Sequence, residues 1–206
     1  GIDVALMFSP SSFHIISHRS IRVTPLKDMR PTRDILYANG LIINGDTLHV
    51  FVVHAPSRYG GERSTRPYRM QVAATLAAAI DSIYSISPEA PILVAGDFND
   101  YHDDPAPRSL YQHGLNNITA QAKGCNGAQG TYKFMGEWRS IDHIMASPKM
   151  TERLMETHIA DLKFLLEEDE KYGGKMPLRT YHGFKYKGGY SDHLPLVARF
   201  NLEVPE

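Results

Sequence analysis

The sequence predicts an α/β protein in which two mixed, largely antiparallel sheets pack together and carry helices on their outer faces. Two observations support this fold class. The expected strands follow one another in meander-like pairs with few helices between them, and one long helical pattern covers residues 67–86. No repeat or linker divides the 206 residues, so we expect a single domain over residues 1–206.

The N-terminal third of the chain reads as strands. An apolar run over residues 2–8 predicts a strand buried on both faces, and a more mixed strand is expected over 13–23. Residues 41–43 and 47–53 flank Asn44-Gly45-Asp46, whose Asn-Gly pair is typical of a hairpin turn. Residues 59–62 then form a polar loop.

The predicted helix over residues 67–86 has one apolar face, formed by Val72, Leu76, Ala79, Ile80 and Ile83. Pro67 near its start and Pro88 beyond its end are typical of the residues that begin and end a helix. A short buried strand follows over 92–95. Asp104 and Pro105 predict the cap and first residue of a brief helix that Gly114 closes.

The remaining third predicts shorter elements. Two strands are expected over 131–134 and 140–145, around Gly136, and a helical turn over 150–155. Residues 162–169 predict a strand followed by a solvated turn, because the segment is apolar and then acidic. Residues 171–189 read as a loop, and the final strand is expected over 196–202.

Composition excludes several classes of protein. The formal net charge of −1 gives no global basic field for nucleic acid. The lone Cys125 excludes an intrachain disulfide framework and a cysteine zinc site. No apolar run reaches the roughly 18 residues of a membrane span. The chain opens at Gly1 within an apolar run, so the compartment is unreadable and we expect that sequence precedes it.

Four predicted strand ends carry polar side chains. His54 ends one strand, and Asp97 and Asn99 follow another. Asp142 lies in the third such segment, and Asp192 and His193 precede the last strand. Because strand ends lie on a rigid scaffold, they can present reacting groups in a fixed geometry.

This set of side chains fits metal-assisted hydrolysis of a phosphoester. The reaction needs a deprotonated water and neutralised charge on the phosphate oxygens. Asp142 can fix the tautomer of His193 and raise its basicity. Carboxylates suit a hard cation such as Mg²⁺. Arg58 can clamp a phosphate through its fork of donors, although an ordinary solvated charge is the alternative for this residue.

In these motifs the chain resembles the endonuclease/exonuclease/phosphatase family, with its deoxyribonuclease-I-like fold. The resemblance covers nearly the whole chain in the family's order, and the pairing of GDFN with SDHLP is its most specific part. The motifs are GIDVALMF, VVHAPSRYGG, residues 69–71, VAGDFND, Asp103-Asp104-Pro105, GEWRSIDHI and GGYSDHLPLV. The implied activity is hydrolysis by in-line attack of an activated water, as in a phosphodiesterase, nuclease or phosphatase.

The resemblance also implies a role for each residue. His54 matches the histidine that contacts the scissile phosphate and assists the leaving group. Asp97 matches the carboxylate that aligns the water, and Asn99 the amide that stabilises the transition state. Asp142 matches the acid that orients the last histidine, His193. Asp192 matches a residue at the metal site, which would take Mg²⁺ or Mn²⁺.

One departure concerns the metal. The family's domain opens with a strand that ends in a metal-binding Asn, followed by a helix and a second strand that deliver the principal Glu ligand. Neither has a counterpart here, and Glu62 and Glu89 lie in other motifs. The alternative to an enzyme is therefore a catalytically inactive, N-terminally incomplete family remnant that acts as a binding domain, with self-association over the missing layer.

The substrate class stays open at this stage. Nucleic acid and the phosphoester of a small molecule or lipid headgroup are both compatible with the motifs. The near-neutral charge favours the second, because duplex binding relies on several phosphate contacts from Lys and Arg.

Overall fold

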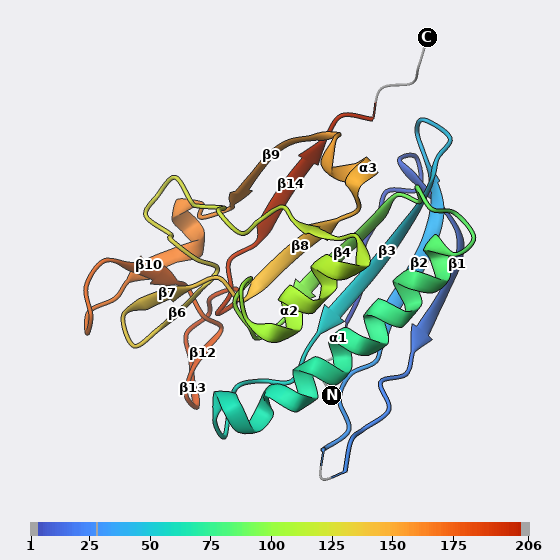
Figure 1. The fold of residues 1–206 in the computed structure, drawn as a ribbon. Helices are drawn as coiled ribbons and strands as arrows, with labels where there is room; N and C mark the ends of the chain where they lie inside the picture. Colours follow the sequence, from blue (N-terminus) through green and yellow to red (C-terminus); the bar gives the residue numbers. More distant parts are fainter. Residues whose placement is uncertain (1–3, 28, 203–206) are drawn as a thin grey trace.

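The computed structural model describes residues 4–27 and 29–202, and a six-stranded mixed sheet forms its centre (Figure 1). The strand order is β1-β2-β3-β4-β8-β5. The strands are β1 (Phe13–Ile21), β2 (Ile35–Ile42), β3 (Thr47–His54), β4 (Ile92–Asp97), β8 (Asp142–Ala146) and β5 (Asn116–Asn117). β3 and β4 run parallel, and the other neighbours run antiparallel. The predicted α/β fold class is confirmed.

The helix α1 (Glu62–Tyr84) covers one face of this sheet (Figure 1). Its side chains Val72, Leu76 and Ile80 are buried there, as the apolar pattern predicts. The sheet contributes alternate residues to the same core, among them Phe51, Val53, Ile92, Val94 and Met145. Because side chains alternate between the two faces of a strand, every second residue of β3 and β4 points toward the helix.

The helix begins at Glu62, five residues before the predicted start at Pro67. The early turns are stabilised locally: the hydroxyl of Thr65 donates to the carbonyl of Gly61 over 2.8 Å, and Arg66 pairs with Glu62 over 2.7 Å. Pro67 therefore lies inside the helix instead of at its first position.

The opposite face of the central sheet packs against a second, two-stranded sheet. This sheet pairs β9 (Leu154–Ile159) antiparallel with β14 (Leu196–Phe200). Phe200 of β14 and Met150 join a core with Leu48 and Ala146 of the central sheet. The predicted final strand is present, whereas β9 was missed because its sequence mixes polar and apolar residues without a clear period.

The remaining elements are short. They are α2 (Pro105–Leu110), η1 (Tyr111–His113), α3 (Pro148–Thr151), η2 (Lys163–Leu165), β6 (Tyr132–Phe134), β7 (Glu137–Arg139), β10 (Leu166–Glu168), β11 (Lys175–Pro177), β12 (Tyr181–His182) and β13 (Lys185–Tyr186). Asp104 and Pro105 start α2, and Gly114 adopts a left-handed conformation after η1, as predicted. The segment expected to be a loop, residues 171–189, contains three short strands.

Two local predictions were wrong, and one region holds an additional strand. Residues 4–8 form no strand, and Met7 is 97% exposed; positions 2 and 3 lie outside the described residues. The two strands expected around Gly136 are present as β6 and β8, and an additional strand, β7, lies between them in the sequence and pairs with β6 across Met135 and Gly136. Both turn residues have positive φ, which is the geometry of a two-residue hairpin, so the partner strand must follow at once. Residues 162–169 begin with a helical turn, and the strand follows it as β10.

Within the described residues, each helix falls short of the length and apolar character that crossing a membrane requires.

Candidate active site

Strand register brings three of the predicted site residues into one row. His54 at the end of β3 pairs with Asp97 at the end of the parallel strand β4. Asp97 pairs in turn with Asp142 at the start of the antiparallel strand β8. Paired residues of neighbouring strands project to the same side, so these side chains meet at one end of the sheet. We call them the strand-end row.

The approach of β3 to β4 depends on Gly96. Its φ is +151°, and a Cβ placed there would lie 1.8 Å from the carbonyl oxygen of Val53. The glycine therefore allows His54 and Asp97 to become neighbours. His54 Nε2 lies 3.5 Å from Asp97 Oδ2.

Asn99 holds the Asp97 carboxylate in place. Its backbone N–H donates to Asp97 Oδ1 over 2.8 Å, and its side-chain Nδ2 donates to Asp97 Oδ2 over 3.0 Å. The same Nδ2 donates to the carbonyl of Ala55 over 3.0 Å. Both amide hydrogens of Asn99 are thus engaged, which makes this residue a positioner of Asp97 in this structure.

His193 joins the strand-end row through Asp142. Its Nδ1 lies 2.8 Å from Asp142 Oδ2, and the buried hydroxyl of Thr131 donates a hydrogen bond to the same oxygen. The segment that carries His193 is fixed to β6 by a bridge between His193 and Tyr132, next to which the backbone N–H of Leu194 donates to Thr131 O over 2.7 Å. The Tyr132 ring packs on the imidazole with centroids 4.8 Å apart.

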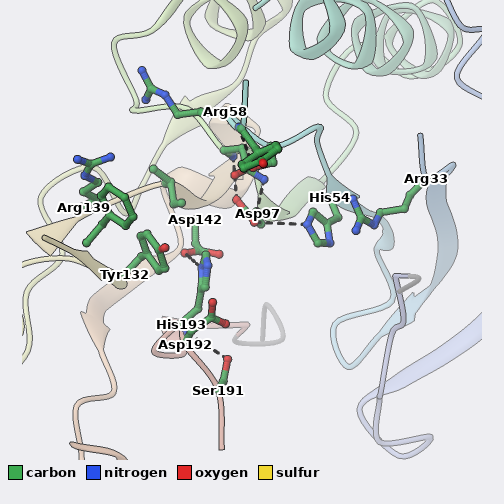
Figure 2. A pocket seen from close by; sticks show the side chains of 15 residues that line it. Arg33, His54, Arg58, Asp97, Tyr132, Arg139, Asp142, Ser191, Asp192 and His193 are labelled. Atoms are coloured by element: carbon green, nitrogen blue, oxygen red, sulfur yellow. Dashed lines mark hydrogen bonds and ion pairs between the residues drawn. The ribbon is translucent and has the colours of Figure 1, made fainter. Parts of the chain in front are cut away.

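All seven predicted site residues line one pocket of about 740 Å³ (Figure 2). They are His54, Arg58, Asp97, Asn99, Asp142, Asp192 and His193. A pocket of this size holds a small organic ligand. Figure 2 shows Asp97, Asp142 and His193 at its centre, with Arg33 beside His54 and Arg139 on the opposite side.

Arg58 lies at the margin of the pocket instead of facing its centre. Its Nη1 donates to Asp104 Oδ2 over 3.2 Å, and its guanidinium lies 5.1 Å from the centre of the Tyr101 ring. In Figure 2 the guanidinium points away from Asp97. Its assignment as a phosphate clamp stays a prediction.

Several pocket residues were missed by sequence reasoning. Arg33 lies two residues before β2, in a segment without a recognisable pattern. Tyr132, Phe134 and Arg139 come from the β6–β7 hairpin, whose pairing was not predicted. Arg139 belongs to the GEWRSIDHI motif, but the sequence of this motif does not indicate that its arginine lines a pocket.

The pKa shifts differ among the titratable groups of the row and His193. Burial, and secondarily the Asp142 charge, raise the pKa of Asp97 to about 7. Burial lowers the pKa of His54, and the Arg33 charge adds to this effect. Burial opposes protonation of His193, but the hydrogen bond and charge of Asp142 outweigh it and raise the pKa of that imidazole. The row therefore holds a neutral His54 opposite a more basic His193.

The donor set fits a hard divalent cation. Asp97, Asp142 and His193 each present a ligand atom, and these atoms lie within 4.8 Å of one another. Burial and the neighbouring Asp142 charge raise the pKa of Asp97, and a cation bound between the two carboxylates would favour their ionised forms. Asp192 lies exposed in the same pocket, so its metal role stays a prediction. The described lining residues include no glutamate.

His143 has a structural role next to the row. It is 1% exposed, and its Nε2 lies 2.8 Å from the carbonyl oxygen of Asp100. Burial lowers its pKa, so the imidazole is neutral. Asp142 lines the pocket, whereas His143 does not.

Comparisons with known proteins define the class of fold. A structural match to the human Nocturnin catalytic domain with bound sulfate covers 94% of this chain and 62% of that domain, with a TM-score of 0.57 and 19% sequence identity. A match to a mannosyl-6-phosphatase of Bacteroides thetaiotaomicron covers 93% of this chain and 68% of that protein, with a TM-score of 0.62 and 16% identity. A match to a truncated TDP2 of Caenorhabditis elegans covers 92% of this chain and 66% of that structure, with a TM-score of 0.56 and 19% identity. These are deoxyribonuclease-I-like structures, and the chain spans about two thirds of their length.

The chain belongs to the endonuclease/exonuclease/phosphatase family, whose model matches residues 1–201. This is a family of hydrolytic phosphoesterases. No curated protein matches the chain.

Proposed function

We propose that this protein is a metal-dependent phosphoester hydrolase that acts by in-line attack of water. The observation that carries the proposal is the strand-end row with His193 attached to it. Two carboxylates and two imidazoles converge in one pocket, and strand pairing, not loop conformation, sets the spacing of three of them. Families with the same fold can differ in chemistry, so the site and not the fold supports the assignment.

His193 and Asp97 would activate the water. With its Nδ1–H donated to Asp142, a neutral His193 leaves Nε2 free to accept a proton from water in the pocket. Asp97 would align the same water, and Asn99 fixes the carboxylate through two hydrogen bonds. Thr131 holds Asp142 from its other side, so the base is oriented by a buried contact.

The developing charge would be stabilised from the other side of the row. His54 is neutral because burial lowers its pKa, and it can therefore donate one hydrogen bond to a phosphate or leaving-group oxygen. Arg33 places positive charge beside it. Asp97 and Asp142 would hold a Mg²⁺ or Mn²⁺ ion, which supplies charge neutralisation at the phosphate oxygens.

Hydrolysis of bis-p-nitrophenyl phosphate and p-nitrophenyl phosphate tests the proposal. We expect turnover with Mg²⁺ that EDTA abolishes and that His193→Ala lowers at least about 100-fold, because a general base contributes that much or more. His18→Ala is the matched control, since His18 is exposed on β1 at the far edge of the sheet.

A chain that is folded by circular dichroism but hydrolyses neither ester would contradict the proposal. It would favour the alternative of a binding domain. If EDTA leaves the turnover unchanged, the protein is a hydrolase but its reaction does not depend on a metal ion.

A further inference from the structure

The turn that follows β4 carries backbone strain. Asn99 has a φ of +51°, a left-handed conformation that residues other than glycine rarely adopt. In this conformation its backbone N–H and its side-chain amide both donate to the carboxylate of Asp97. A strained residue keeps its conformation only where the surrounding structure determines it from several sides. The contacts that hold this turn are therefore part of how the site is built.

Asp100, the residue after Asn99, is fixed to two other elements of the fold. It is fully buried, and so is the side chain of Arg69 on α1. Arg69 Nε lies 2.7 Å from Asp100 Oδ1, which makes the two a buried ion pair. The backbone carbonyl of Asp100 accepts a hydrogen bond from Nε2 of His143 in β8 over 2.8 Å. The turn is thus attached to α1 through a side chain and to β8 through its backbone.

Arg69 is itself held in place by the first turns of α1. Its Nη1 donates to the hydroxyl of Thr65 over 2.7 Å, and its Nη2 donates to the carbonyl of Glu62 over 3.0 Å. Nε is the guanidinium nitrogen that faces Asp100. Because a guanidinium is planar and rigid, these contacts fix the direction from which it meets the carboxylate. Arg69 is therefore a rigid link between the start of α1 and the turn after β4.

Attachment of the helix to the sheet does not account for this ion pair. The helix α1 is already held there by its buried apolar side chains, Val72, Leu76 and Ile80. Burying two charges requires their desolvation, and well-packed apolar residues often stabilise a fold as well or better. What a charged pair adds is a defined distance and direction between its partners. Here the partner that becomes fixed is the neighbour of Asn99.

We propose that the Arg69–Asp100 ion pair is a positioning device for the reaction, which holds Asn99 in its strained conformation. Asn99 then keeps the Asp97 carboxylate in the orientation that aligns the attacking water; this rests on the proposed function. Neither Arg69 nor Asp100 lines the pocket, so both are positioning residues that act through Asn99. The helix α1 thereby contributes to the site although it presents no reacting group.

The double variant Arg69→Met with Asp100→Leu tests the proposal, because it removes both charges and keeps apolar volume. We expect its urea midpoint of unfolding to stay close to that of the parent chain. With bis-p-nitrophenyl phosphate we expect kcat to fall about tenfold and KM to change little, because a small displacement of Asp97 misaligns the water. Arg66→Ala is the matched control, since it removes the partly exposed ion pair with Glu62 on the same helix. It should leave kcat unchanged.

Hydrogen exchange measured by NMR follows the turn without requiring turnover. The backbone N–H of Asn99 is protected by its hydrogen bond to Asp97. In the double variant it should exchange at least about tenfold faster, whereas the N–H of Leu76 in the middle of α1 should exchange as in the parent. Arg69→Lys keeps a positive charge but loses the planar fork of donors, so it should show the same selective changes at about threefold. This milder variant decides the question if the double variant does not fold.

Unchanged kcat in a folded double variant of an active parent would overturn the inference. Exchange that accelerates equally at Leu76 and Asn99 would overturn it as well, since the ion pair would then only hold the helix. Failure of the proposed function gives a different result. In that case the parent chain would not hydrolyse the ester, while exchange at Asn99 alone would still respond to the variants.

Discussion

Asp142 is held from two directions, and this makes Thr131 a positioning residue that no sequence motif indicated. Thr131 is fully buried, and its hydroxyl donates to the oxygen that also accepts from His193. Its relation to the site arises from the fold, because Thr131, just before β6, meets Asp142 at the start of β8 only in the tertiary structure. Single-sequence reasoning could identify Asp142 and His193 as partners but not the third member of their contact.

Replacing Thr131 by Val should lower kcat by about tenfold while KM changes little, since the change acts through Asp142 on the base and not on bound substrate. Thr131→Ser retains the hydroxyl and should retain most of the activity. Kinetics with bis-p-nitrophenyl phosphate and circular dichroism of each variant would check this. A similar loss in both variants would assign Thr131 to packing.

Asp142→Asn tests the carboxylate itself. The amide can present its N–H to His193 Nδ1 and favour the wrong tautomer, so we expect kcat to fall by about 10³-fold or more with the fold retained. Asp192→Asn is the matched comparison, because it removes a carboxylate from the same pocket without a contact to His193 Nδ1. We expect it mainly to raise the Mg²⁺ concentration that gives half-maximal rate. Equal losses of kcat in the two variants would contradict the distinct role of Asp142.

At the scale of elements, the strand-end row requires close packing of β3 on β4. Gly96→Ala would place a methyl group against the Val53 carbonyl in a strained backbone conformation. We expect loss of about 3 kcal/mol or more of the free energy of unfolding, or failure to fold. Gly45→Ala, in the open turn between β2 and β3, should cost about 1 kcal/mol. Urea unfolding of both variants measures this, and a Gly96→Ala protein of near-normal stability would contradict it.

The elements that sequence reasoning found are those with strong local signals. The turn at Asn44-Gly45, the apolar face of α1 and the buried strand β4 each identify themselves within a short window. The elements that it missed take their identity from distant partners: β9 is a strand because β14 pairs with it, and β7 because a tight turn folds it onto β6. The apolar run at the start failed for the same reason, since residues 4–8 have no strand partner among the described residues.

For the molecule as a whole, Asp46 links distant parts of the chain. Its carboxylate pairs with Lys149 over 3.0 Å and with Arg153 over 2.7 Å, which joins the β2–β3 turn to the segment between β8 and β9. Burial alone would raise the pKa of Asp46, but the hydrogen bonds from Arg153, Lys149 and Asn44 outweigh it and lower this pKa below the usual value.

The pH dependence of this link has a defined sign. A carboxyl group whose pKa is lower in the folded state stabilises the fold above its unfolded pKa of about 3.9, and the effect is lost as the pH falls through the folded value. Asp46→Asn should therefore reduce the free energy of unfolding by about 1 kcal/mol at pH 7. The difference from the parent chain should shrink below about pH 4. Urea titrations at pH 7, 5 and 3 check this, and a difference that stays constant to pH 3 would contradict it.

Two different parts of the fold line the pocket: the central sheet and the β6–β7 hairpin. The strand-end row belongs to the central sheet, whereas the pocket residues Tyr132, Phe134 and Arg139 belong to a peripheral hairpin that meets the His193 segment at Tyr132. The register of the row is thus set by strand pairing in the sheet, whereas the side of the pocket that faces it is set by a two-residue turn at Met135 and Gly136. Exchanging residues 134–139 for another short hairpin would therefore change the lining of the pocket while leaving the register of the strand-end row unchanged.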